Sequence, residues 1–326
     1  MPFERGHGLL RWGGAVTLLV LLAAAAAPWI SPHDPRQQLD PASARHRPPG
    51  TRLAVVRLAD GATLLADAVE RTPTGLRVQR LGSWRSLPAS QVLNLAPRGV
   101  DTWRTYPLGT DRYGRDVASR LLWGGRVSLR VALLAVALAL TLGVLIGAVA
   151  GLGPAVVDAV LMRGVDALMA FPRLFLVLAV AALWRSGELA AVVVLGGTGW
   201  MEVARLTRGE VLRLRGLDFV QAARAMGAPP WRIAFVHVLP LAVVPLFAHT
   251  ALRVGDTILT ESALSFLGFG VTPPTPSWGN LIADGQDVLL DAWWVAALPG
   301  VAIAVTVLGF ALLGDGLRAV LDPRSR

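Results

Sequence analysis

The chain has 326 residues, of which 54% are hydrophobic and 16% charged, and its mean hydropathy is +0.54. This composition is too apolar for an ordinary soluble domain and indicates several membrane spans. The absence of cysteine excludes disulfides and thiolate metal sites. The net charge of +9 is more typical of arginine-rich loops on an anionic membrane surface than of a nucleic-acid-binding protein.

Residues 1–30 are predicted to form an N-terminal transmembrane helix. A basic start is followed by an apolar run over residues 12–30, which is long enough to cross the hydrocarbon core. Pro28 and Pro32 are expected to end this helix. The alternative is a cleaved signal peptide, with the small residues 23–27 as its cleavage site.

Residues 31–105 are predicted to form an extracytoplasmic linker that contains a small β-module at about residues 51–95. Turn signals at Asp60-Gly61 and at residues 72–75 separate short runs with strand character. The expected strands are residues 53–58, 63–69, 76–80 and 84–87. The core of so short a module is thin, so we expect it to lean on the rest of the protein. A disordered insert is the alternative.

Residues 106–326 carry the remaining apolar runs. Gly143 and Gly147 have the small-xxx-small spacing that lets two helices approach closely, although glycine is common here and the spacing could be chance. Residues 196–199 are glycine-rich, which indicates either close packing or a kink. The predicted fold is an all-α polytopic membrane protein with six transmembrane helices and a small extracytoplasmic β insert. The five spans after the first are predicted at about residues 127–151, 167–184, 189–204, 239–259 and 292–313.

The distribution of arginine predicts the orientation. The segment 205–238 is arginine-rich, as is the C-terminal tail with Arg318, Arg324 and Arg326, whereas residues 261–291 contain no arginine. Because basic short loops remain on the cytoplasmic side, six spans with both termini cytoplasmic satisfy this pattern. Residues 31–105 are then external.

A helix, a turn and a second helix are predicted within residues 218–240. Asp218 is a good N-cap for the first helix, and Gly227 suits a left-handed C-terminal cap. Its apolar face is expected to comprise Phe219, Ala222, Ala223 and Met226.

Pro229 and Pro230 prevent the first helix from continuing, but they suit the first turn of the next one. We expect that second helix over residues 231–239, with Pro240 at its join with the following span. The segment has the size of a docking element, and an ordinary interhelical loop is the alternative.

No catalytic or metal-binding motif is found, and no cofactor is expected in this chain. The sequence contains no lysine, so it cannot supply the lysine that a G-x-x-x-x-G-K-[ST] loop places on ATP phosphates. Any ATP-driven work therefore requires a partner. The five histidines do not cluster; they are His7, His33, His46, His237 and His249.

Arg253 and Asp256 are ionisable groups inside the predicted fifth span, close to His249. Such groups are costly at membrane depth and usually face a cavity or a partner. Their spacing of three residues would let Arg253 and Asp256 pair with each other. Two interpretations remain open: the residues line a polar pathway, or they form a structural pair near the external interface.

The order Gln221-Ala222-Ala223, Gly227 and Leu239-Pro240 resembles the EAA loop of importer-type ABC transporter permeases. Two positions depart from that pattern: Gln221 replaces its glutamate, and His237 replaces its isoleucine. Further blocks resemble the second, or C-type, permease subunit of the dipeptide/oligopeptide/nickel branch. They are Pro107–Asp116, Leu264–Gly279, Gly314–Arg318 and Leu321–Arg324.

The resemblance implies a type I ABC importer permease fold that forms a transport pathway with a homologous permease. It implies two cytoplasmic ATPase subunits, which bind ATP and Mg²⁺, and an extracytoplasmic solute-binding protein that delivers peptides or similar small solutes. The chain itself would be a non-catalytic subunit in the inner membrane. The residues implied in coupling to the ATPases are Gln221, Ala222, Ala223, Met226, Gly227, Leu239 and Pro240.

Residues 51–95 are additional to the family pattern. We hypothesise that this module contacts the binding protein or the partner permease. Two alternatives to a transport subunit remain: an ATP-independent secondary carrier or channel, and a membrane-anchored sensor that acts through the β-module.

Overall fold

The computed structural model describes residues 2–93, 102–184 and 186–321, with side chains from His7 onward. Asn94 and Leu95, at the end of the predicted β-module, lie outside the described residues, and so do Arg324 and Arg326 of the predicted basic tail. The chain forms two compact units. Unit 1 comprises Met1–Leu22, Val127–Thr272 and Ala302–Arg326, and unit 2 comprises Ala23–Arg126 and Pro273–Val301.

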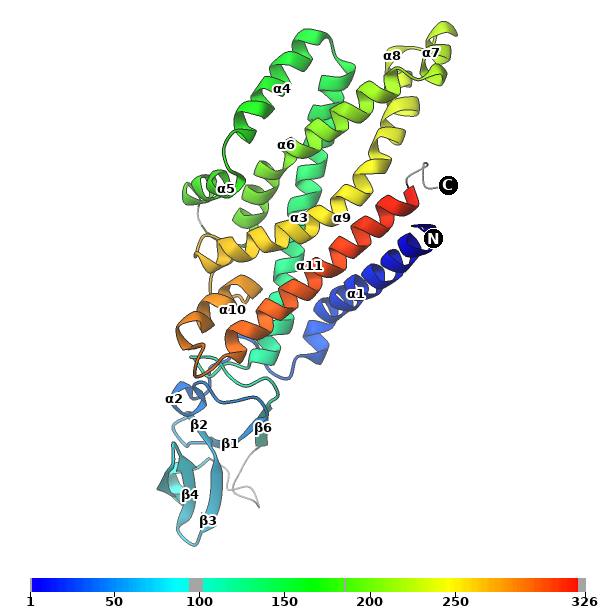
Figure 1. The fold of residues 1–326 in the computed structure, drawn as a ribbon. Coiled ribbons are helices and arrows are strands. Elements are labelled where there is room, and N and C mark those ends of the chain that lie inside the picture. The colour runs from blue at the N-terminus through cyan, green and yellow to red at the C-terminus, as the bar shows by residue number, and fades with distance from the viewer. Residues whose placement is uncertain (1, 94–101, 185, 322–326) are drawn as a thin grey trace. The chain divides into compact units, whose positions relative to one another are not determined.

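Long apolar helices dominate the chain (Figure 1). Five are long and apolar enough to cross a membrane, and a bent pair of shorter helices makes up to six spans. This agrees with the predicted membrane fold. The helices of the spans are α1 (Pro2–Ile30), α3 (Val117–Leu152), α4 (Ala155–Met169), α5 (Arg173–Ala182), α6 (Glu188–Arg215), α9 (Leu239–Phe266) and α11 (Trp294–Leu321).

The third span was predicted as one run over residues 167–184, but the structure has two helices there with a break between them. Helix α4 ends at Met169, α5 begins at Arg173, and the two are bent by 88°. Pro172 explains the break, because proline disfavours helical backbone at the preceding residue and lacks an N–H of its own.

The other four spans after the first are longer than predicted. Helix α3 begins at Val117 rather than at residue 127, and α11 continues past residue 313 to Leu321. Helix α6 continues past Ala204 to Arg215, and α9 continues past Leu259 to Phe266. The prediction ended each span where charged residues appear, but the hydrogen bonding of a helix does not depend on the polarity of its side chains. As a result Glu261, expected in a polar loop, is fully buried in α9.

Glycines bring α3 and α6 into close contact. A Cβ atom at Gly143 would collide with Val203, one at Gly147 with the Ala204 carbonyl, and one at Gly151 with Val211. The close approach predicted from the glycine spacing is therefore confirmed. In the glycine-rich stretch of α6, a Cβ at Gly196 would collide with Leu138, which favours close packing there over a kink.

Contacts of α11 fix the direction of its neighbours within unit 1. Gly316 lies against Leu10 of α1 and Gly309 against Val16, so α1 and α11 run antiparallel. Gly314 lies against Leu252 of α9, and Gly255 of α9 lies against Val307. Helices α9 and α11 are therefore also antiparallel. The start of α1, the start of α9 and the end of α11 lie at the same end of unit 1.

Unit 2 contains two three-stranded antiparallel sheets. The predicted β-runs are confirmed, except that the second is interrupted at Asp67 and a sixth strand was missed. One sheet has the order β2 (Thr63–Ala66), β1 (Thr51–Arg57), β6 (Thr102–Tyr106), and the other has the order β3 (Ala68–Thr72), β4 (Gly75–Arg80), β5 (Ser83–Pro88). The remaining elements of unit 2 are α2 (Pro41–Ala44), η1 (Ala89–Gln91), α10 (Trp278–Gly285) and η3 (Gln286–Val288).

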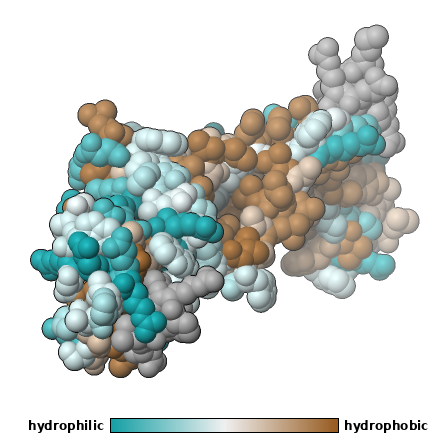
Figure 2. Space-filling view, turned by 90° about the horizontal axis from the view of Figure 1, so that it is seen from below, coloured by the Kyte–Doolittle hydropathy of each residue, from teal (hydrophilic) through white to brown (hydrophobic). Residues whose placement is uncertain are grey.

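Small clusters of aliphatic side chains hold the strands together. Val56 and Ala66 from the first sheet share one cluster with Leu76 and Val78 from the second. On the face shown in Figure 2, the strand-bearing part is largely hydrophilic, whereas the long helices are largely hydrophobic. This difference is expected when the helices face lipid and the strands face water.

The α3–α6 contact predicts opposite effects for two glycine-to-alanine substitutions. Gly147→Ala forces a methyl group onto the backbone of α6 and should destabilise the chain by about 1–3 kcal/mol. Gly197→Ala meets nothing within 4 Å, so its higher helix propensity should leave stability unchanged or raise it by up to about 1 kcal/mol. Thermal unfolding of the detergent-purified chain measures both, and equal effects would contradict the packing.

Candidate functional site

A helix–turn–helix segment projects between α6 and α9 at one end of unit 1. It consists of α7 (Asp218–Ala225), a turn at Gly227, α8 (Pro230–Arg232) and a π-helical turn, η2 (Ile233–Val238), that leads into α9 (Figure 1). We call residues 217–240 the tip segment. The predicted helix, turn and second helix are confirmed, with differences at both ends.

The turn after α7 is set by Gly227. Its φ of +79° lies in the left-handed region, as predicted. The N–H of Ala228 donates to the Ala223 carbonyl and the N–H of Gly227 donates to the Arg224 carbonyl. These two bonds form a Schellman motif, which satisfies the last carbonyls of the helix. At the other end, Asp218 is the first helical residue; the predicted N-cap position belongs to Leu217, which has no side-chain cap.

The second helix does not end at Pro240. From Pro230 the backbone stays helical through η2 and α9 as far as Phe266. Pro240 lies in the first turn of α9, directly after the π-helical turn. The wider π turn accommodates a proline, which has no N–H to donate and whose ring would crowd the carbonyl four residues earlier.

One side of the tip segment packs against α6, and its other side is apolar and exposed. Val220, Ile233 and Val238 are buried against Val211 and Leu214 of α6. Of the residues predicted to share the apolar face of α7, Ala223 is buried, whereas Phe219, Ala222 and Met226 are exposed. The most exposed large hydrophobic side chains of the tip segment are Met226 at 81%, Phe235 at 67% and Trp231 at 64%. An exposed apolar patch of this kind is typical of a surface that binds another protein.

Polar and basic groups surround this patch. Gln221 is exposed, and its side-chain amide donates to the Arg215 carbonyl at 3.1 Å. Arg215 in turn donates to the Gly151 carbonyl at the end of α3. A cavity of about 300 Å³ lies beneath, lined by Arg215, Arg224 and apolar residues. The glutamine thus ties the tip segment to α6 without adding a charge.

The predicted pairing of Arg253 with Asp256 is wrong. Arg253 pairs with Glu202 of α6, and Asp256 pairs with Arg173 of α5. Because side chains three residues apart on a helix diverge by about 60°, each was free to meet a different neighbouring helix. Sequence spacing alone could not reveal partners that lie more than fifty residues away.

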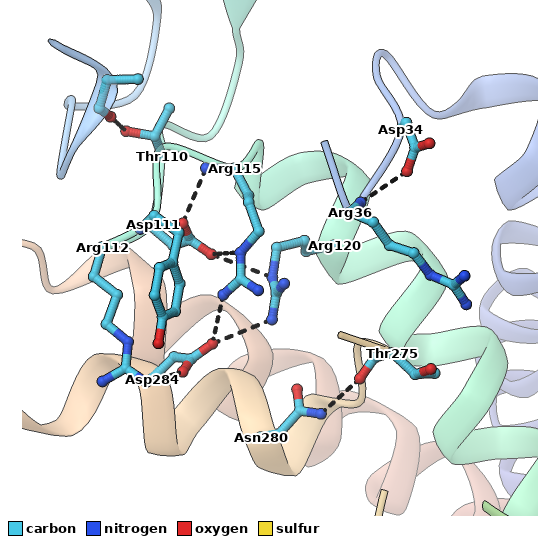
Figure 3. Close-up of polar contacts among 12 residues, drawn as sticks. Asp34, Arg36, Thr110, Asp111, Arg112, Arg115, Arg120, Thr275, Asn280 and Asp284 are labelled. Atoms are coloured by element: carbon cyan, nitrogen blue, oxygen red, sulfur yellow. Dashed lines mark hydrogen bonds and ion pairs between the residues drawn. The ribbon is translucent and has the colours of Figure 1, made fainter. Parts of the chain in front are cut away.

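A buried charge cluster in unit 2 was also missed (Figure 3). Asp284 of α10 accepts from Arg115 at 2.9 Å and from Arg120 at 3.2 Å, and its other oxygen pairs with Arg112 at 3.1 Å. Asp111 accepts from the Nε of Arg115 at 2.6 Å. The cluster therefore fastens the loop 107–116 to α10. The only signal in the sequence was the arginine- and aspartate-rich block at Pro107–Asp116.

Ala44 and His46, which precede β1, also form hydrogen bonds with the loop 107–116. Thr110 donates to the Ala44 carbonyl, and the backbone N–H of His46 donates to the Asp111 carbonyl at 3.1 Å. Burial, followed by repulsion from Arg45, lowers the pKa of His46, and burial raises the pKa of Tyr106. Both side chains are therefore uncharged at neutral pH.

Across residues 2–93, 102–184 and 186–321, no group of three or more histidine, aspartate or glutamate side chains could hold a metal ion. Several of the acidic side chains instead pair with arginines, as described above.

Two family models match the chain. Residues 143–326 match the binding-protein-dependent transport system inner membrane component, and residues 5–49 match the N-terminal transmembrane domain of oligopeptide transport permease C. The chain is 35% identical to the di/tripeptide transport system permease protein DppC of Pseudomonas aeruginosa, over 99% of this chain and 90% of that one.

It is also 41% identical to the glutathione transport system permease protein GsiD of Pectobacterium atrosepticum, over 67% of this chain and 72% of that one. Among solved structures, the methionine ABC transporter MetNI in inward-facing conformations matches with a TM-score of 0.49 and 20% identity, over 62% of this chain and 97% of that one.

The charge cluster predicts that Asp284→Asn is strongly destabilising. The change preserves the size of the side chain but leaves Arg115 and Arg120 buried with Asp111 as their remaining counter-charge. Breaking a buried ion pair in this way costs about 3–5 kcal/mol. Asp287→Asn, at an exposed position in η3, is the matched control. Limited proteolysis of the two full-length variants should show faster cleavage in residues 31–126 for Asp284→Asn alone, and equal rates would contradict the assigned role.

Proposed function

The chain belongs to the family of inner membrane components of binding-protein-dependent transport systems, and from that premise we propose that it couples ATP hydrolysis by partner subunits to the import of short peptides. It is a multi-pass permease subunit of an ABC importer. The proposed pathway forms between this chain and a homologous permease. An extracytoplasmic binding protein delivers the solute.

The main support for this proposal is the exposure of the tip segment. This segment combines a rigid turn at Gly227 with a side that packs against α6. Its other side is an exposed apolar surface around Met226, Trp231 and Phe235. Because η2 leads into α9 without a break, a displacement of the tip segment would move the whole of α9. The coupling residues inferred from the EAA resemblance all lie in this segment; they are Gln221, Ala222, Ala223, Met226, Gly227, Leu239 and Pro240.

The ATPase chemistry is assigned to partners. Without lysine, this chain cannot form the phosphate-binding loop that ATPases of this kind use. Two cytoplasmic ATPase subunits would bind ATP and Mg²⁺ and dock on the tip segment. The exposed aromatic and methionine side chains are of the type enriched at protein interfaces.

The orientation proposed for the chain has both termini and the tip segment in the cytoplasm. The antiparallel contacts of α1, α9 and α11 support it, because they bring these three parts to one end of unit 1. Arginine is abundant in the tip segment and in the end of α6, which is the distribution expected for the cytoplasmic side. The β-module would then be external.

Peptides are the proposed solute class. The relatives named above are permeases for di- and tripeptides and for glutathione, which is itself a peptide. The match to DppC covers 99% of this chain, so it includes the β-module, whereas the match to GsiD covers 67%. We propose that the module contacts the external binding protein or the partner permease.

Substitution of Gly227 tests the coupling role. Gly227→Trp should leave the chain inserted but reduce ATP-driven peptide uptake at least about tenfold, because a side chain is strained at this φ and its bulk blocks docking. Gly227→Asn is the matched control, since asparagine tolerates left-handed backbone, and it should retain most of the uptake. The measurement is ATP-dependent uptake by proteoliposomes that contain the assembled transporter.

Wild-type uptake by Gly227→Trp would refute coupling through the tip segment. Uptake that persists after the ATPase subunits are removed would favour a secondary carrier. Loss of function on deletion of residues 51–95, with no effect of Gly227→Trp, would favour a sensor.

A further inference from the structure

A cavity of about 270 Å³ lies within unit 1, among α4, α5, α6 and α9. Its charged lining consists of Arg173, Glu202 and Arg253, and the rest is apolar apart from Thr198 and backbone. Its volume is near the lower limit of roughly 300–1,000 Å³ for small-molecule sites. A cavity of this size would hold a peptide of about two residues.

The broken span forms one wall of this cavity. Residues 168–173, which include the end of α4 and the start of α5, all line it. The ten-residue helix α5 has no side-chain cap at its N-terminus. Its first N–H groups therefore carry an unneutralised partial positive charge, and the C-terminus of α4 presents the opposite partial charge. Broken helices in membrane proteins place such ends where they line a polar cavity.

Arg253 is buried in this wall, with 5% of its surface exposed. One guanidinium nitrogen pairs with Glu202, and another donates to the Gly199 carbonyl at 2.9 Å. Gly199 permits this approach, because a Cβ there would lie 3.2 Å from the same nitrogen. The Nε of Arg253 has no hydrogen-bond partner among the described residues. The arginine thus retains an unused donor although it is almost fully buried.

Arg173 also has a hydrogen-bond donor that no described residue uses. It pairs with Asp256, while its own Nε has no hydrogen-bond partner in the part of the chain that the structure describes. A carboxylate accepts two parallel hydrogen bonds from a guanidinium, which makes it the natural ligand for these donors. The side chain of Glu202, in contrast, is about half exposed and lines the cavity, so its carboxylate can reach a cation there.

Glu202 also lines a second cavity, of about 670 Å³, together with Arg205, His249 and Arg318. Glu202, the partner of Arg253, therefore stands at the boundary of the two cavities. A solute that replaces Glu202 as the partner of Arg253 would free Glu202 to bind an ammonium group.

We propose that this cavity is a transit site for a zwitterionic solute, with Arg253 and Arg173 binding its carboxylate and Glu202 binding its ammonium group. The proposal rests on the import function above and specifies what the pathway recognises: the free termini of a short peptide rather than its side chains. The Arg253–Glu202 and Arg173–Asp256 ion pairs keep the empty site neutral. When the solute binds, its carboxylate replaces Glu202 as the partner of Arg253, and its ammonium group replaces Arg253 as the partner of Glu202.

The absence of cysteine allows a test that requires no ATPase. Leu176→Cys places a thiol on α5 in the cavity wall. Full-length chain in membrane vesicles is labelled with methanethiosulfonates that carry a sulfonate, a trimethylammonium or no charge. The sulfonate should react faster than the trimethylammonium reagent. The preference should fall on the order of tenfold when Arg253→Gln or Arg173→Gln is added.

Arg205→Gln is the matched control, because Arg205 lines the second cavity but not this one; it should leave the preference intact. Arg253→Lys retains the charge and should retain most of the preference. Unchanged labelling by the neutral reagent shows that each variant keeps its fold.

Solute recognition is tested with dialanine and with its N-acetylated, C-amidated analogue. Dialanine should slow the labelling of Leu176→Cys, the blocked analogue should not, and Glu202→Gln should abolish the difference. The absence of charge preference would overturn the site. A charge preference without selective protection by dialanine would overturn its assignment to a zwitterion. Loss of the import function would leave these labelling results unchanged, so the two proposals fail separately.

Discussion

The hydrocarbon core imposes one constraint on which this structure depends: a buried polar group must find its partner within the protein. In unit 1 the constraint is met by pairs between helices distant in sequence, such as Arg253 with Glu202 and Arg173 with Asp256. Each pair ties α9 to a neighbour. The helix break at Pro172 lies beside these pairs and lines a cavity. Charge and irregular backbone therefore occur together, at the place where a solute could use them.

The packing of the helices complements this constraint. Glycines on α3 and on α11 replace side chains with backbone contact, so the helices are held by close approach rather than by interlocking large residues. Such an arrangement transmits displacement well, because helices in van der Waals contact cannot shift independently. The tip segment extends from this packed group and is fixed to α6 by Val220, Ile233 and Val238. Its outer surface remains apolar, which is consistent with a partner that binds there.

Much of the architecture could be predicted from sequence, because hydrophobic run length and turn chemistry are local properties. The spans, the strands and the left-handed Gly227 follow from such signals. What failed depends on three-dimensional context. The partners of Arg253 and Asp256 lie on other helices, and the role of Asp284 became visible only once α10 was placed beside the loop 107–116. In the tip segment, spacing groups apolar residues on one face of an eight-residue helix but does not show which residues are buried. Val220 and Ala223 are buried there, whereas Met226 is exposed.

The proposed function requires that the tip segment receive the movement of the ATPase subunits. The most direct measurement is cross-linking from a single cysteine at Met226→Cys, an exposed position in a chain without other cysteines. In the assembled transporter, a photoactivatable group on this thiol should capture an ATPase subunit, and the yield should change when ATP binds. Capture of the ATPase at a yield independent of nucleotide, or capture of only the partner permease, would contradict the account.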